Sequence, residues 1–157
     1  MNNNLSIEKF FPTLNLIFIA FFSGQIIYLL IGLFIIQNGN MKGIPGLNTI
    51  FMFITPVVIL FSIFASKFIY SKQVASLDRS SSLESKLVSY RTGNIVKLAL
   101  LEGANIFNVS VMIITANYFF AALFIIIIGF FFVNKPTKEK FILEFEISAE
   151  EALKIIG

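Results

Sequence analysis

The side chains that could do chemistry in this sequence gather in one apolar stretch. Glu102 lies there with Lys97, Asn105 and Asn108. At about 100° per residue, these side chains together with Arg91 and Asn94 occupy an arc of roughly 140° on one side of a helix. An ionisable residue in such a stretch is costly and normally faces protein or water. We therefore expect this arc to face the interior of a helix bundle.

Two kinds of chemistry are open to Glu102. The preferred interpretation is a structural ion pair with Lys67, which lies in a second apolar segment expected to run antiparallel at a similar depth. Lys97 points away from Glu102, and its long side chain can extend to the membrane surface. The alternatives are a proton or cation site, or a contact with a cofactor or lipid. Small four-helix multidrug transporters use one membrane acid, but in their first helix and with a Trp, whereas this chain has no Trp.

Missing residue types exclude many activities. The chain has no Cys and no His, which removes disulfides, iron–sulfur clusters, cysteine zinc sites and imidazole catalysis. It contains no GxxxxGK[ST], GxGxxG or GxSxG motif. The net charge of +3 is modest and gives no sign of nucleic-acid binding. We therefore expect no enzymatic activity, no cofactor and no nucleic-acid partner.

The elements that position these residues are expected to be membrane-spanning helices. The chain has 157 residues, of which 57% are hydrophobic and only 13% charged, and its mean hydropathy is +0.86. A span needs about 20 largely apolar residues. The continuous apolar runs predict an all-α, integral membrane four-helix bundle rather than a barrel. The predicted transmembrane domain covers residues 1–134, with spans at about 11–36, 49–70, 95–116 and 118–133, and a tail follows at 135–157. Gln25 in the first span is expected to hydrogen-bond across helices.

The placement of Lys and Arg predicts the orientation. The loop after the first span carries one cation, Lys42, and the turn after the third span carries none. We therefore expect both termini to be cytoplasmic. The segment after the second span and the tail hold most of the remaining cations, namely Lys67, Lys72, Arg79, Lys86, Arg91, Lys135, Lys138, Lys140 and Lys154.

The polar segments carry helix-capping signals. Ser81 to Glu84 fits a capping box with Ser81 as the N-cap, so the third span is expected to begin as a cytoplasmic amphipathic extension near Ser82. Thr137 follows Pro136 and could cap a helix in the tail.

Apolar side chains in the tail need cover. Phe141, Ile142 and Phe145 would be exposed to water unless something packs on them. The candidates are the extension of the same chain, which is the default, the bilayer interface, or another subunit, for which these three residues would form the docking surface. Residues 141–147 also alternate in polarity, so a strand is an alternative to a helix there.

The second half of the chain resembles a known family. Tyr90 and Thr92 precede the segment ALLEGA at Ala99–Ala104, and PTKEK follows at Pro136–Lys140. This combination resembles a family of small four-span bacterial inner-membrane proteins that has no established activity. The resemblance implies the topology and the bacterial cytoplasmic membrane, and it implies no mechanism.

These sequence patterns are compatible with two functions. The first is a non-enzymatic accessory, assembly or scaffolding component of a membrane complex, whose partners are the lipid bilayer and other membrane subunits or a second copy. The alternative is a small proton-coupled transporter that acts as a homodimer through Glu102. A membrane enzyme acting on lipid comes third, because no paired carboxylates support it.

Overall fold

The apolar runs fold into helices because a backbone in lipid must satisfy its hydrogen bonds internally. A computed structural model describes residues 7–39, 42–44, 46–78 and 80–156. Within these residues the fold is all-α and contains no strand, so the predicted fold class is confirmed. Arg79 and the side chain of Lys154, two cations of the polar segments, lie outside the described residues.

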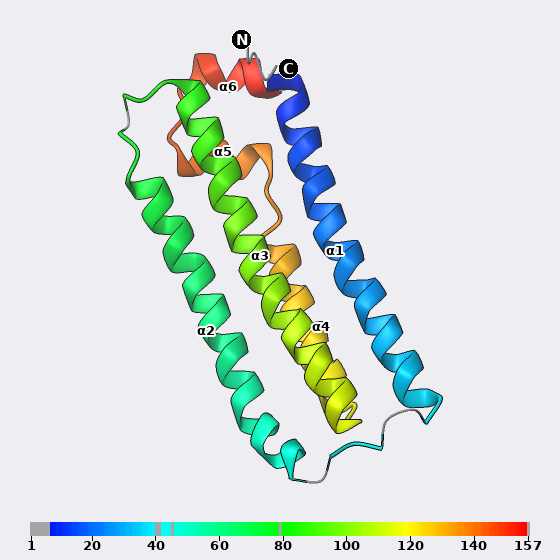
Figure 1. Cartoon of the computed structure of the whole chain (residues 1–157). Helices are drawn as coiled ribbons and strands as arrows, with labels where there is room; N and C mark the ends of the chain where they lie inside the picture. The colour runs from blue at the N-terminus through cyan, green and yellow to red at the C-terminus, as the bar shows by residue number, and fades with distance from the viewer. Residues whose placement is uncertain (1–6, 40–41, 45, 79, 157) are drawn as a thin grey trace, which may run out of the picture.

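The described residues form four long helices that lie side by side and two short helices at one end of them (Figure 1). We call the end with the short helices the tail end and the opposite end the loop end. The helices are α1 (Ile7–Gln37), α2 (Leu47–Ala75), α3 (Leu83–Thr115), α4 (Phe119–Val133), α5 (Lys138–Glu144) and α6 (Ala149–Ile156).

In the described part of the chain, three helices, or four if a bent pair is counted as one span, are long and apolar enough to cross a membrane. Helices α1, α2 and α3 are each long and apolar enough to cross a membrane. Helix α4 has only 15 residues, about 22 Å at the usual rise. A fourth crossing is counted only if α4 and α5, which are bent by 68° relative to each other, are taken as one span. The chain therefore has the helices of a multi-pass membrane protein.

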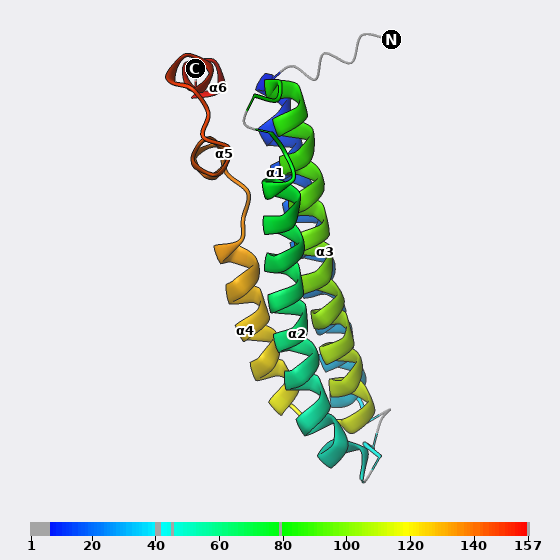
Figure 2. The same cartoon turned by 90° about the vertical axis from the view of Figure 1, so that its left-hand side faces the viewer.

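Helix α3 is the central element of the bundle. It lies between α1 and α2 in Figure 1, with α4 behind it, and the turned view in Figure 2 places α4 on one side of α3. Phe11 of α1 meets Tyr90 near the tail end, and a Cβ on Gly32 would meet Met112 near the loop end, so α1 and α3 are parallel.

Helix α2 runs the other way. Its residue Phe51 packs on Phe107, and Tyr70 lies against Lys97, so α2 is antiparallel to α3. Residues of α3 therefore meet side chains from every long helix.

The helix caps explain where the elements begin. The N-cap of α3 is Ser82, whose hydroxyl accepts from the N–H of Ser85 at 3.3 Å, so the expectation that Ser81 caps this helix is wrong by one residue. The predicted extension of α3 before its apolar part is present as unbroken helix from Leu83. Thr137 caps α5 by accepting from the N–H of Lys140 at 3.3 Å.

The tail is helical where a strand was the alternative. Helix α5 extends to Glu144, and a turn follows in which Glu146 has a φ of 48°. A short helix therefore replaces the alternating strand, because the Thr137 cap starts α5 at Lys138 and the N–H of Phe141 already bonds to the carbonyl of Thr137 at 3.2 Å.

The core is built in successive layers, and the outside is apolar. One cluster of buried residues lies at the tail end, a second around Phe18 and Leu98, and a third around Met112 and Phe124 near the loop end. Large apolar side chains also lie exposed on the outer faces of α1, α2 and α4; Phe53, for example, is 75% exposed. An apolar exterior around a packed core is expected of a bundle surrounded by lipid.

Candidate functional site

Glu102 lies at the seam between α3 and α1. It is half-buried, and its Oε1 would be 3.5 Å from a Cβ placed on Gly24 of α1. Within the described residues it makes no hydrogen bond and no ion pair. Glu102 therefore faces α1 without a partner for its carboxyl group.

The expected Lys67–Glu102 ion pair is absent. Lys67 is exposed on α2, whereas Glu102 faces α1, and these two helices flank α3 on opposite sides (Figure 1). The antiparallel contacts of Tyr70 with Gly93 and Lys97 also place Lys67 nearer the tail end than Glu102, so the expectation of a similar depth was wrong. The pairing hypothesis was therefore wrong.

The amides of the predicted polar arc are buried and bridge helices. Asn105 of α3 donates through Nδ2 to Oε1 of Gln25 in α1 at 2.7 Å, and Gln25 donates to the carbonyl of Phe21 at 3.2 Å. Asn108 donates to the carbonyl of Phe120 in α4 at 2.7 Å. Gln25, Asn105 and Asn108 are almost fully buried, as predicted for residues of the arc and for Gln25. They hold α1 and α4 against α3.

Several buried acceptors have no donor. The side-chain oxygens of Asn94, Asn105 and Asn108 on α3 and of Thr55 on α2 are buried and make no hydrogen bond with any residue that the structure describes. Unpaired polar atoms in an apolar interior are costly. The interior of the bundle therefore has more acceptors than its own donors satisfy.

Lys97 lies in an aromatic environment. It is buried, with its Nζ 3.9 Å from the centroid of the Tyr70 ring. The Tyr70 hydroxyl in turn donates to the carboxylate of Glu144 in the tail. Lys97, Tyr70 and Glu144 thus connect α3, α2 and the tail end of the chain. The arc predicted the burial of Lys97 and gave no sign of its aromatic partner.

The tail is joined to α3 by Tyr90. The Tyr90 hydroxyl donates to the carbonyl oxygen of Thr137 at 2.9 Å and accepts from the N–H of Thr137 at 3.0 Å. A hydrogen bond from its own backbone N–H, and another from the Thr137 hydroxyl, hold the pKa of Glu139 below its ordinary value. Thr137 therefore caps α5 and anchors it at the same position.

Lys140 holds the end of α4. Its Nζ donates to the carbonyl of Val133 at 2.6 Å and to that of Lys135 at 2.9 Å. The last carbonyls of a helix lack intrahelical donors and carry a partial negative charge, so an ammonium group there is favourable. The PTKEK segment thus ends α4 and starts α5.

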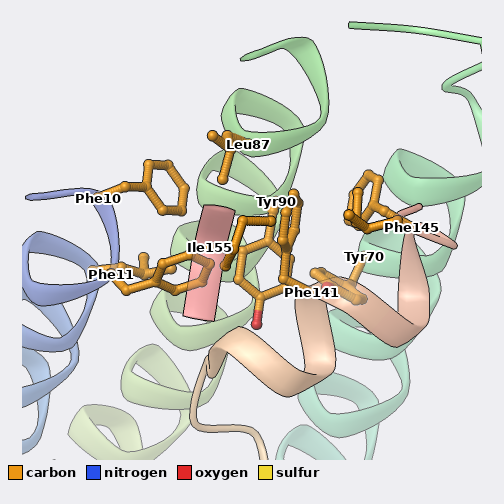
Figure 3. Packing of buried hydrophobic residues seen from close by; sticks show 10 residues of the cluster. Phe10, Phe11, Tyr70, Leu87, Tyr90, Phe141, Phe145 and Ile155 are labelled. Atoms are coloured by element: carbon orange, nitrogen blue, oxygen red, sulfur yellow. The ribbon is translucent and has the colours of Figure 1, made fainter. Parts of the chain in front are cut away.

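The apolar tail residues are covered by their own chain. Phe141 is fully buried and Phe145 is 7% exposed, and Ile142 is half-buried beside them. Figure 3 shows the ring of Tyr90 among the rings of Phe11, Phe141 and Phe145. This packing agrees with the default expectation that residues of the same chain would cover the apolar side chains of the tail. Phe141 and Phe145 therefore present no docking surface in this structure.

One face of α3 is left uncovered. Its residues recur three or four positions apart and so lie on one side of the helix, opposite α4 and between α1 and α2 (Figures 1 and 2). Beyond it toward the loop end, Tyr28 of α1 covers Ser110 with a hydrogen bond of 2.9 Å. We call this surface the open face; its exposed residues are Thr92, Val96, Ala99, Gly103 and Ile106.

A polar cavity lies at the tail end. It has a volume of about 290 Å³, and its lining includes Asp78, Lys86 and Glu144. Lys86 is 7% exposed. The N–H and hydroxyl of Ser80 bond to Asp78 and hold its pKa below the ordinary value. Among the residues that the structure describes, no group of three or more acidic side chains is placed to hold a metal ion.

The sequence did not indicate several side chains that make the polar contacts at the tail end. Tyr70, Glu144, Lys86 and Lys140 were not among the predicted site residues. A signal existed for Tyr90, which shares a helical face with Leu83 and Leu87. No periodicity could have indicated that its hydroxyl binds the backbone of Thr137.

Comparison of the chain with family models, with curated proteins and with solved structures found no match.

Proposed function

We propose that this protein is a non-enzymatic accessory subunit that binds another membrane protein within the bilayer of the bacterial inner membrane. The observation that carries the proposal is the open face of α3. Helix α3 is otherwise enclosed by three helices, yet Ala99, Gly103 and Ile106 remain exposed at membrane depth. Small residues on a membrane helix allow another helix to approach closely.

The charge on the helix ends supports a four-span topology with cytoplasmic termini. Lys42 is the one cation in the described part of the loop-end connections, whereas Lys67, Lys135 and Lys140 lie toward the tail end. An excess of lysine and arginine marks the cytoplasmic side. Alkaline phosphatase fused after Lys42 should be active, and a fluorescent protein fused after the tail should be fluorescent. The opposite pattern would reject this topology.

Site-directed photocrosslinking in native membranes tests the proposal. Benzoylphenylalanine is placed at Ile106, on the open face, or at Ile126 on α4. The two isoleucines are a matched pair, because they are of one type and are 43% and 52% exposed. We expect adducts with another membrane protein from position 106 and none from position 126. Absence of protein adducts at position 106, or equal adducts at both positions, would reject an accessory role through this face.

A second candidate function is a proton-coupled transporter that acts as a homodimer. Two observations favour it: Glu102 has no partner in the described part of the chain, and buried acceptors such as Asn105 Oδ1 are left without donors. Uptake of tetraphenylphosphonium into proteoliposomes under an imposed pH gradient tests it, with Glu102→Gln as the control. Uptake that is absent, or unchanged in this variant, would reject the transporter.

A further inference from the structure

Two features of α3 at the same depth point to the chemistry of the partner. Gly103 and Ala99 are exposed and small, and Glu102 lies beside them at the edge of the open face. The spacing of four residues between Ala99 and Gly103 is the small-xxx-small arrangement of closely packed membrane helices. A helix lying on this face would therefore bring its backbone close to α3 and its side chains close to Glu102.

Among the described residues, no cationic side chain pairs with Glu102. The lysines toward the tail end are engaged elsewhere or face away: Lys97 lies over the Tyr70 ring, Lys135 lies over the Phe18 ring, and Lys67 is exposed on α2. Carboxylates within the membrane normally pair or face water, because an uncompensated charge there is costly. No described residue of this chain therefore supplies the group that would pair with Glu102.

Resting on the proposed function, we infer that the open face takes a transmembrane helix that carries one lysine or arginine at the depth of Glu102. Charge complementarity favours such a helix over a second copy of this chain. A two-fold dimer through the open face would bring two Glu102 carboxyl groups toward each other, and like charges repel strongly away from water. A transmembrane helix of another protein that carries one cation would be complementary to the face in both shape and charge.

Glycine gives a way to block the face without disturbing the fold. A Cβ on Gly103 would meet nothing within 4 Å, so Gly103→Leu projects into the space that the partner needs. Gly129→Leu on α4 is the matched control, because it also projects from a helix into open space. Both substitutions replace glycine inside a helix and should not weaken it.

The test measures binding of defined helical peptides to the full-length protein in phosphatidylcholine vesicles. The chain contains no Cys, so Asn38→Cys provides one exposed labelling site at the loop end. The probes are two donor-labelled leucine–alanine transmembrane peptides, one with a lysine at the depth of Glu102 and one with methionine there. Energy transfer to the labelled protein reports association.

We expect the lysine peptide to bind about tenfold more tightly than the methionine peptide, the size of effect that one polar contact has in membranes. Glu102→Gln should remove this preference, and Gly103→Leu should abolish binding of both peptides, whereas Gly129→Leu should change neither. In Glu102→Lys the preference should pass to a peptide with glutamate, which shows that charge rather than fold is responsible. Equal binding of the two peptides to the wild-type protein, or a lysine preference that survives Glu102→Gln, would overturn the inference.

Failure of the inference is distinguishable from failure of the proposed function. Energy transfer between two labelled copies that Gly103→Leu abolishes would show that a second copy occupies the face. That result overturns the cationic partner while the face remains an interface. Absence of protein adducts from position 106 in native membranes rejects the proposed function itself.

Discussion

The hydroxyl of Tyr90 makes two hydrogen bonds with the backbone of one residue, Thr137, donating to its carbonyl oxygen at 2.9 Å and accepting from its N–H at 3.0 Å. The Tyr90 ring packs among the rings of the tail-end cluster (Figure 3), and its hydroxyl thereby joins this cluster to the N-cap of α5. It gives a physical reason for the joint presence of Tyr90 and the PTKEK segment in one chain. The tail is thereby a packed part of the bundle.

Tyr90→Phe should loosen the tail. The ring stays, but two backbone groups of Thr137 lose their partner, and an unsatisfied buried group costs about 1–3 kcal/mol. Amide hydrogen exchange over residues 137–145 should accelerate while exchange in α4 stays unchanged. Tyr118→Phe, at a tyrosine that is 51% exposed, is the control. Equal acceleration in both variants would count against the contact.

Lys140→Met should fray the end of α4. The ammonium group now meets the carbonyls of Val133 and Lys135, and its loss removes about 1–2 kcal/mol of charge-assisted hydrogen bonding. Unfolding in mixed detergent micelles, followed by circular dichroism, measures the change. Lys138→Met, two residues earlier, should have little effect. A larger loss at position 138 than at 140 would contradict this role.

A double-mutant cycle should detect the Gln25–Asn105 hydrogen bond. Gln25→Leu leaves both polar atoms of the Asn105 amide without partners, so it should cost more than Asn105→Leu, after which Gln25 still bonds to Phe21. The coupling energy should be about 0.6–1.7 kcal/mol, the range found for polar pairs in membranes. The free energy of unfolding of the four proteins gives the value, and strictly additive losses would exclude the bond.

Glu102 and Lys67 should show no coupling. The two side chains lie on different sides of α3, so the effects of Glu102→Gln and Lys67→Met on unfolding should add within about 0.3 kcal/mol. Glu102→Gln by itself should leave the isolated protein as stable as before, because it removes a carboxyl with no partner in the described residues. A clear rescue of Glu102→Gln by Lys67→Met would restore the ion-pair hypothesis.

Two glycines of α3 should respond in opposite ways to alanine. A Cβ on Gly93 would lie 2.9 Å from Cδ2 of Tyr70, so Gly93→Ala must displace that ring and should cost about 1–3 kcal/mol. Gly103→Ala meets no neighbour and should gain about 0.5–1 kcal/mol from helix propensity. Thermal unfolding of both variants in detergent checks the difference in sign. Stabilisation by Gly93→Ala would mean that α2 and α3 are farther apart than described.

Composition and periodicity were enough to predict the helices. The apolar runs predicted all four long helices, and the capping signal at Thr137 located α5, because both depend on residues close in sequence. The helical period also predicted that Asn105, Asn108 and Lys97 face the interior. These features follow from local geometry.

The partners of the polar side chains were decided by the packing of helices. Periodicity gives the direction of Glu102 on α3 but not which helix lies in that direction, and the structure places Gly24 of α1 there rather than Lys67 of α2. The contact of Tyr90 with Thr137 likewise joins residues 47 positions apart in sequence. Such pairings, and the open face itself, arise from the way α1, α2 and α4 pack around α3, which no local pattern encodes.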